Sequence, residues 1–111
     1  MKVIIMFSKS PALRSDKLRN AAKDQQCAVQ ILDVCNFNPE TVVLAHLPSC
    51  THGMAYKSDD IWAVDCCSSC HDVLDGRVPF EWLAGEKEQY ILAALHTTLM
   101  RRIRDNILVI Q

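Results

Sequence analysis

A pair of cysteines with a histidine directly after it carries the most recognisable chemistry of this chain. Cys67 and Cys70 are separated by two serines, and His71 follows them. Two thiolates at this spacing can hold one tetrahedral zinc ion from a single tight turn. Cys27 and Cys35 form an upstream pair that can complete a four-cysteine site. The pattern therefore indicates a structural zinc site beside a histidine that the zinc does not need.

Two histidines remain available for hydrolytic chemistry. His71 and Asp75 are four residues apart, so on a helix they would lie on one face and could share a divalent ion. Asp72 is the alternative second ligand. His46 ends an apolar segment, and a histidine can take a proton from water near neutral pH. Arg77 could then clamp a phosphate with two donors. These residue types suit the hydrolysis of a phosphodiester bond.

Each of these assignments has a structural alternative. The four cysteines could be reduced core residues, and His46 could be a hydrogen-bonded histidine at a strand end. His71 could instead lie next to the zinc or replace one thiolate. We expect Cys66 to point away from the metal and Cys50 to be a free thiol in a loop. The histidines for which we expect no functional role are His52 and His96.

The length and composition indicate a single domain. The chain has 111 residues, of which we expect 1–14 to form a partly disordered extension and 15–111 to form one zinc-binding domain. It lacks the run of about 18 apolar residues typical of a membrane-spanning helix, and its start lacks the features of a secretory signal. We therefore expect a cytoplasmic protein without a membrane partner, in which cysteines favour metal binding over disulfides.

The net charge of −1 gives no overall argument for a nucleic-acid partner, but the charges are distributed unevenly. Residues 1–24 contain six lysines and arginines against two acids, whereas residues 59–88 contain eight acids against two bases. The basic segment could lie along a phosphate backbone, or it could be a solvated helix face. The residues we expect to contact phosphate are Arg77, Lys17, Arg19 and Lys23; the group Arg101, Arg102 and Arg104 could do so too, or could favour the dipole of a helix.

Three segments have helical patterns. Residues 15–23 can form a short helix with Ser15 as its N-cap. A second helix can begin at Ser69 and end near Gly76, and residues 79–104 show a long amphipathic pattern.

Other segments favour strands. Residues 27–34 are rich in β-branched residues that roughly alternate, residues 41–46 form an apolar run, and residues 60–64 lead into the cysteine pair. Residues 107–110 also resemble a strand. The order is helix, β-hairpin, short helix and long helix, which is an α+β domain. In this order a histidine from the hairpin can face a metal ligand on the following helix.

Four stretches, at residues 18–27, 34–41, 44–47 and 67–77, together resemble a family of small prophage-encoded nucleases related to the zinc-stapled HNH (ββα-metal) endonucleases. The resemblance covers roughly residues 10–110, with the motifs in the family's order and spacing. It implies an HNH-like ββα-metal core with a four-cysteine zinc site, an N-terminal helix and a long C-terminal helix.

The resemblance also implies roles for individual residues. His46 would be the general base and His71, with Asp75 or Asp72, a ligand of a catalytic Mg²⁺ or other divalent ion. Many HNH enzymes carry a further metal ligand just before the base, where this chain has Ala45. Either the helix supplies the missing ligand, or the ion is held weakly, or activity has been lost. The structural zinc ligands would be Cys27, Cys35, Cys67 and Cys70.

The function predicted from these observations is a metal-dependent endonuclease that acts on DNA in phage recombination or replication. A homodimer could form through the long C-terminal helix and the chain end. One alternative is a zinc-containing nucleic-acid-binding module without catalysis, which Ala45 and the acidic central segment favour. The other is a thiol redox protein that uses Cys67 and Cys70 as a reactive dithiol.

Overall fold

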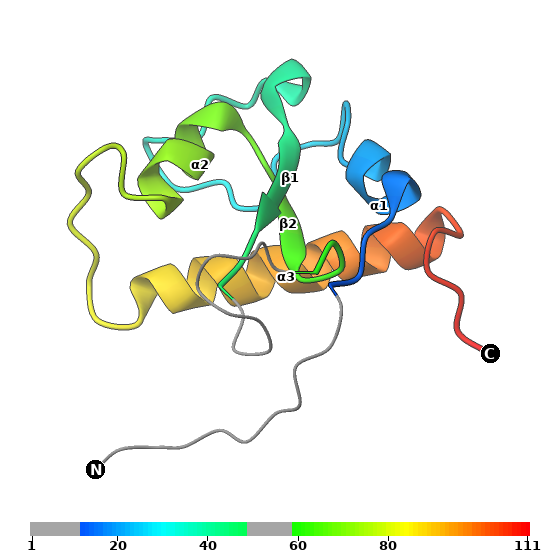
Figure 1. Cartoon of the computed structure of the whole chain (residues 1–111). Helices are drawn as coiled ribbons and strands as arrows, with labels where there is room; N and C mark the ends of the chain where they lie inside the picture. The colour runs from blue at the N-terminus through cyan, green and yellow to red at the C-terminus, as the bar shows by residue number, and fades with distance from the viewer. Residues whose placement is uncertain (1–11, 49–58) are drawn as a thin grey trace, which may run out of the picture.

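A computed structural model gives the architecture of the protein and describes residues 12–48 and 59–111 (Figure 1). The first helix, α1, spans Asp16–Ala21. The side chain of Ser15 accepts a hydrogen bond of 3.2 Å from the backbone N–H of Leu18, which confirms the predicted N-cap. Within the described residues no helix is long and apolar enough to cross a membrane. The predicted roles of Cys50 and His52 lie outside the described residues.

The sheet consists of two short antiparallel strands. A 3₁₀ turn at Pro39–Thr41 leads into β1, which spans Val43–His46, and the second strand, β2, spans Ala63–Cys66. The hairpin therefore comes from the segments predicted at 41–46 and near 60–64, although β2 begins later than expected. Its Cα register pairs Val43 with Cys66, Leu44 with Asp65, Ala45 with Val64 and His46 with Ala63.

Two helices follow the hairpin. The first, α2, spans Ser68–Leu74 and begins immediately after β2, with Cys67 as its N-cap. It ends before Gly76, whose φ of +76° is a conformation that glycine adopts easily, as predicted. The second, α3, spans Glu86–Arg104 and is shorter than the predicted 79–104.

The late start of α3 has a structural cause. The Phe80 and Trp82 rings pack 4.4 Å apart between their centroids, and Trp82 also meets Tyr90 at 5.9 Å. These aromatic side chains hold the segment before the helix in an irregular path. Gly85, with φ of +78°, then turns the chain into α3.

The two other strand predictions were wrong. Residues 27–34 form turns and irregular backbone, and Gln30 and Asp33 have positive φ angles that interrupt an extended chain. Residues 107–110 form no strand either, because the backbone N–H groups of Ile107 and Leu108 both donate to the carbonyl oxygen of Arg102. The chain end therefore folds back on the C-terminal turn of α3 instead of extending along a sheet.

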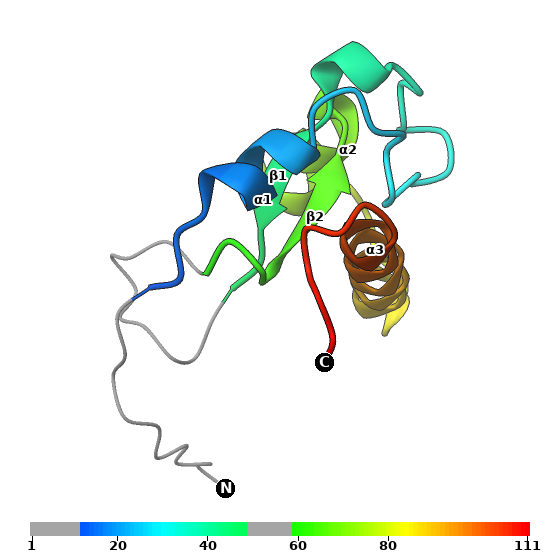
Figure 2. The same cartoon turned by 90° about the vertical axis from the view of Figure 1, so that its right-hand side faces the viewer.

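The sheet lies between α1 and α3, as the view along α3 shows (Figure 2). The core forms where β2 packs against α3 and where the irregular segment around Cys27 covers the start of α2. The apolar residues buried in the main core cluster include Val29, Ile31, Val42, Ala45, Val64, Val73 and Ala94, together with Cys27, Cys66, Cys67 and Cys70.

Candidate metal centre and adjacent pocket

The four cysteines predicted to bind zinc meet at one point. Their sulfur atoms all lie within 4.8 Å of one another, although two come from the irregular segment and two from the junction of β2 with α2. The Sγ atoms of Cys35 and Cys67 are 3.8 Å apart. A tetrahedral zinc with Zn–S bonds of about 2.3 Å places its sulfurs about 3.8 Å apart. The geometry therefore fits a four-thiolate metal site of the kind zinc occupies.

Backbone N–H groups surround this cluster and point at its sulfurs. Cys27 accepts from the N–H groups of Cys67, at 3.3 Å, and Gln30, at 3.5 Å. Cys70 accepts from Ile31 at 3.4 Å, and Cys67 accepts from Cys70 at 3.4 Å. Such donors favour negatively charged sulfur and orient the ligands. Residues 27–34, which were predicted to form a strand, are thus a ligand loop, that is, a loop that carries a cysteine ligand and directs backbone N–H groups at the cysteine sulfurs.

Close packing of the thiols shifts their pKa values in opposite directions. Hydrogen bonds from Cys66 and Cys70 lower the pKa of Cys27, whereas burial raises the pKa of Cys35 to about 11. The hydrogen bond to Cys27 is also the main cause that raises the pKa of Cys70. Opposite pKa shifts of this kind are expected of thiols that are packed closely enough to interact.

Cys66 is the fully buried neighbour that does not join the four-thiol group, as predicted. Its Sγ lies 3.5 Å from the carbonyl oxygen of Cys67, and its hydrogen bond to Cys27 is the largest cause that raises its pKa. Cys66 therefore supports the cluster from outside as a protonated thiol.

A pocket of about 580 Å³ lies beside the metal centre. His46 from β1, His71 from α2 and Asp75, the C-cap of α2, all contribute to its wall. Lys17 is exposed on α1 but is not part of the pocket wall. Among the described residues the lining consists of Arg19, Ala22, Lys23, Val42, Val43, Leu44, His46, His71, Asp75 and Arg77.

The i, i+4 pair predicted on α2 is formed. His71 Nε2 lies 3.1 Å from Asp75 Oδ2, with both side chains partly exposed to the pocket. Two ligand atoms on neighbouring corners of a Mg²⁺ octahedron with bonds of about 2.1 Å would be about 3.0 Å apart. The distance between His71 and Asp75 is therefore compatible with a shared divalent ion as well as with a direct hydrogen bond. Arg77 lies 3.5 Å from Asp75 and 3.3 Å from Asp72. Asp72 thus pairs with Arg77, while Asp75 is the acid that lines the pocket.

His46 has a partner that sequence reasoning missed. Its Nε2 lies 2.8 Å from Oδ1 of Asp60, whose side chain is only 1% exposed. Asp60 belongs to the turn before β2, and the register that pairs His46 with Ala63 brings the two residues together. No spacing rule in the sequence signals this contact, because it depends on which two strands pair and in which register.

Asp60 is ionised in the folded protein. Burial by itself would raise its pKa, but the hydrogen bonds from His46 and from the backbone N–H of Ser15, and the charge of Arg19, lower the pKa below its ordinary value. An ionised carboxylate can only accept hydrogen bonds. His46 therefore donates from Nε2, and in its neutral form its lone pair is on Nδ1.

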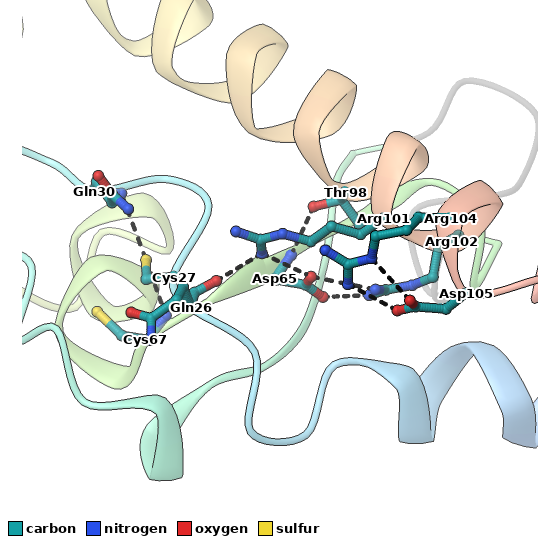
Figure 3. A network of polar contacts seen from close by, with 10 residues as sticks. All are labelled: Gln26, Cys27, Gln30, Asp65, Cys67, Thr98, Arg101, Arg102, Arg104 and Asp105. Carbon is teal, nitrogen blue, oxygen red and sulfur yellow. Dashed lines mark hydrogen bonds and ion pairs between the residues drawn. The ribbon is translucent and has the colours of Figure 1, made fainter.

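Two of the three arginines at the end of α3 contact the buried Asp65 of β2 (Figure 3). Arg102 is 2% exposed and forms a close ion pair with the buried Asp65 of β2. Arg101 donates to Asp65 at 3.1 Å and to the carbonyl oxygen of Gln26 at 2.7 Å. Arg104 pairs with the neighbouring Asp105. Arg101 and Arg102 therefore tie α3 to the sheet, whereas Arg104 pairs at the end of the helix and its side chain is 61% exposed.

Comparison with known proteins places this chain in a group named for nuclease activity. A family described as "Putative nuclease YbcO" matches residues 16–105. The chain belongs to this family. It is similar to "Putative nuclease YbcO" of Escherichia coli (strain K12) and to "Putative nuclease ybcO" of Enterobacteria phage 82. Each is 47% identical over 64 residues, which cover 57% of this chain and 67% of the relative.

A solved structure from the same bacterium is also similar. It is described as "Structure of a putative bacteriophage protein from Escherichia coli str. K-12 substr. MG1655", and it superposes with a TM-score of 0.65 at 35% sequence identity. The match covers 81% of this chain and 100% of that one. The range matched by the YbcO family includes all four cysteines and the whole pocket wall.

Proposed function

We propose that the protein is a metal-dependent endonuclease that hydrolyses DNA phosphodiester bonds, and that the pocket beside the cysteine cluster is its active site. One observation carries the proposal. His46 of β1 lines one pocket together with His71 and Asp75 of the α2 region, in a member of a family named for nuclease activity. The order of β1, β2 and α2 is also the ββα order of the HNH-like core that the sequence resembles.

The metal centre would serve as a structural staple. Cys67 and Cys70 belong to the first turn of α2, and Cys27 and Cys35 belong to the loop that covers it. Zinc held by these thiolates would fix the start of the helix that carries His71 one residue later. The zinc would thereby hold the pocket wall in place without taking part in the reaction.

His46 is suited to the role of general base. Its side chain is 23% exposed on the pocket wall, so a water molecule can approach it, and Asp60 holds the opposite ring nitrogen. In this arrangement Nδ1 accepts the proton of the attacking water. The position before it, Ala45, is 3% exposed and lies in the core, so a longer side chain there would enter the core instead of the pocket.

His71 and Asp75 would hold the catalytic divalent ion. When bound, such an ion supplies charge stabilisation for the phosphorane and for the leaving oxygen. The two residues offer two ligand atoms, which leaves most positions of a Mg²⁺ ion to water and to the phosphate itself. We therefore expect weak binding of the ion in the absence of nucleic acid.

Cations around the pocket would bind the DNA backbone. Arg77 is 64% exposed in its side chain and Lys23 is exposed on the pocket rim, so both can meet phosphate. Lys17 would add a contact further along α1. Arg19 and Arg77 each pair with two acids, but the side chain of Arg19 is less exposed, at 44%, and one of its partners is the buried Asp60, so its contribution would be smaller. We place this activity in phage recombination or replication.

The proposal is tested with zinc-loaded protein on two substrates. Nicking of a supercoiled plasmid is followed with Mg²⁺, with Mn²⁺ and with EDTA, and fluorescence anisotropy of a labelled duplex reports binding in the same buffers. Cleavage that requires the divalent ion supports the nuclease. Binding without cleavage under either ion would contradict it and favour a non-catalytic nucleic-acid-binding module.

A further inference from the structure

Asp60 is a buried carboxylate without a role in binding the predicted metals or phosphate. It is only 2% exposed, and it lies in the turn that leads into β2. A charge buried this deeply is costly unless it is fully paired. The groups that pair with Asp60 therefore indicate its role.

Within residues 12–48 and 59–111, four donors surround this carboxylate, and they come from two parts of the chain. Oδ2 accepts from the backbone N–H of Ser15 at 2.7 Å and from Arg19 at 2.8 Å. Oδ1 accepts from His46 Nε2 at 2.8 Å and from Arg14 at 3.4 Å. A carboxylate has about four acceptor sites, so these donors saturate it. Asp60 thus has no remaining lone pair for a metal ion and is fixed in its orientation.

We infer that Asp60 is a positioning residue for His46, which fixes the histidine in the Nε2–H tautomer and aims its Nδ1 for proton abstraction. The inference rests on the proposed function for its catalytic consequence, but its structural part does not. Because the Ser15 and Arg19 contacts belong to the start of α1, the same carboxylate ties the orientation of the base to the docking of α1 on the hairpin.

Other charged groups around His46 do not set its tautomer. Of the pocket cations, Arg19 pairs with Asp60 and Asp16, and Arg77 pairs with Asp72 and Asp75. A lysine ammonium can only donate, so Lys23 cannot accept the ring proton. The charged and titratable groups that share the pocket with His46 are Arg19, Lys23, His71, Asp75 and Arg77, and Asp60 contacts it directly.

The experiment compares wild type with Asp60→Asn and with Arg14→Gln, all zinc-loaded and full-length. The asparagine keeps the shape but offers one acceptor oxygen to four donors, so the preference for the Nε2–H tautomer is lost. Arg14→Gln replaces the guanidinium that donates to Asp60 with a shorter, uncharged amide and leaves the His46 contact intact. Imidazole ¹⁵N shifts at about pH 8, where histidine is mostly neutral, report the tautomer of His46. Steady-state nicking gives kcat and KM separately.

We expect wild type and Arg14→Gln to hold His46 as the Nε2–H tautomer with equal kcat. In Asp60→Asn we expect a tautomer mixture and a kcat lower by about 10- to 100-fold, with KM changed by less than about twofold. An Nδ1–H tautomer in wild type would overturn the inference even if the variant failed to fold. A folded Asp60→Asn variant with an unchanged kcat, compared with a wild type that cleaves DNA, would also overturn the inference. If wild type does not cleave, the proposed function fails, and the tautomers alone decide whether Asp60 positions His46.

Discussion

Replacement of a single cluster cysteine should convert the folded protein into one that cannot hold its metal. Cys66 and Cys67 are adjacent and both fully buried, but only Cys67 belongs to the four-thiol group. They therefore form a matched pair in which one side chain is a predicted ligand and the other is its neighbour. We compare Cys67→Ala with Cys66→Ala.

The expected magnitudes differ widely. Structural zinc contributes about 10–16 kcal/mol of apparent binding free energy in small zinc domains, which equals or exceeds the roughly 5–15 kcal/mol by which domains are stable. Loss of one of four ligands should thus leave Cys67→Ala largely unfolded. Cys66→Ala removes one buried sulfur and should cost about 1–2 kcal/mol, from the cavity and the lost packing.

The assay measures zinc content after gel filtration and the urea midpoint by far-UV circular dichroism. Wild type and Cys66→Ala should carry one zinc per chain, and EDTA should lower the urea midpoint of both. Cys67→Ala should carry much less than one zinc and show no cooperative transition. If Cys67→Ala kept stoichiometric zinc and matched Cys66→Ala in urea, the four cysteines would not be a metal site.

Three further changes test the pocket and the core. Asp75→Asn should raise the Mg²⁺ concentration for half-maximal nicking at least about tenfold and leave metal-free duplex binding intact; an unchanged Mg²⁺ requirement would remove Asp75 from the ion site. Because the pKa of Asp60 is lowered in the folded protein, the stability it contributes is present above its ordinary value of 3.8 and is lost as the pH falls below it. The urea midpoints of wild type and Asp60→Asn should therefore converge below about pH 4, and a constant difference would contradict this. Asp65→Asn leaves the buried Arg102 without its anionic partner and should lower the free energy of unfolding by about 3–5 kcal/mol in chemical denaturation, whereas a loss below about 1 kcal/mol would contradict the ion pair's role.

Local sequence patterns predicted the parts of the structure that depend on neighbouring residues. The Ser15 cap, the turn of Cys67 and Cys70, and the pairing of His71 with Asp75 all arise within a few residues of sequence. Such features follow from helix and turn geometry, which the sequence specifies directly. The four-cysteine cluster was also predictable, because paired cysteines at short spacing are residues that commonly bind zinc.

Contacts between segments far apart in the sequence were not predictable. Asp60 and Asp65 belong to the acidic central segment, which suggested an obstacle to DNA binding. In the structure Asp60 pairs with Arg14, and Asp65 pairs with Arg102, so both charges are compensated locally. The partners lie 46 and 37 positions away in the sequence, and only the fold brings them together.

The misread strand at residues 27–34 has a physical explanation. Val29 and Ile31 alternate with exposed Gln30 as they would in a half-buried strand. The same alternation arises here because a ligand loop buries its apolar side chains against the start of α2 while its amides face sulfur. Periodicity reports which side chains are buried and does not distinguish a strand from such a loop.

The most direct test of the proposed active site is plasmid nicking by His46→Ala beside His96→Ala. Both are histidines, but His46 lines the pocket whereas His96 is exposed on α3, away from it. With zinc-loaded protein and Mg²⁺ or Mn²⁺, we predict that His46→Ala loses about 10²- to 10⁴-fold in nicking rate and that His96→Ala retains the wild-type rate. Equal, metal-dependent nicking by all three proteins would contradict the assignment of His46 as the base.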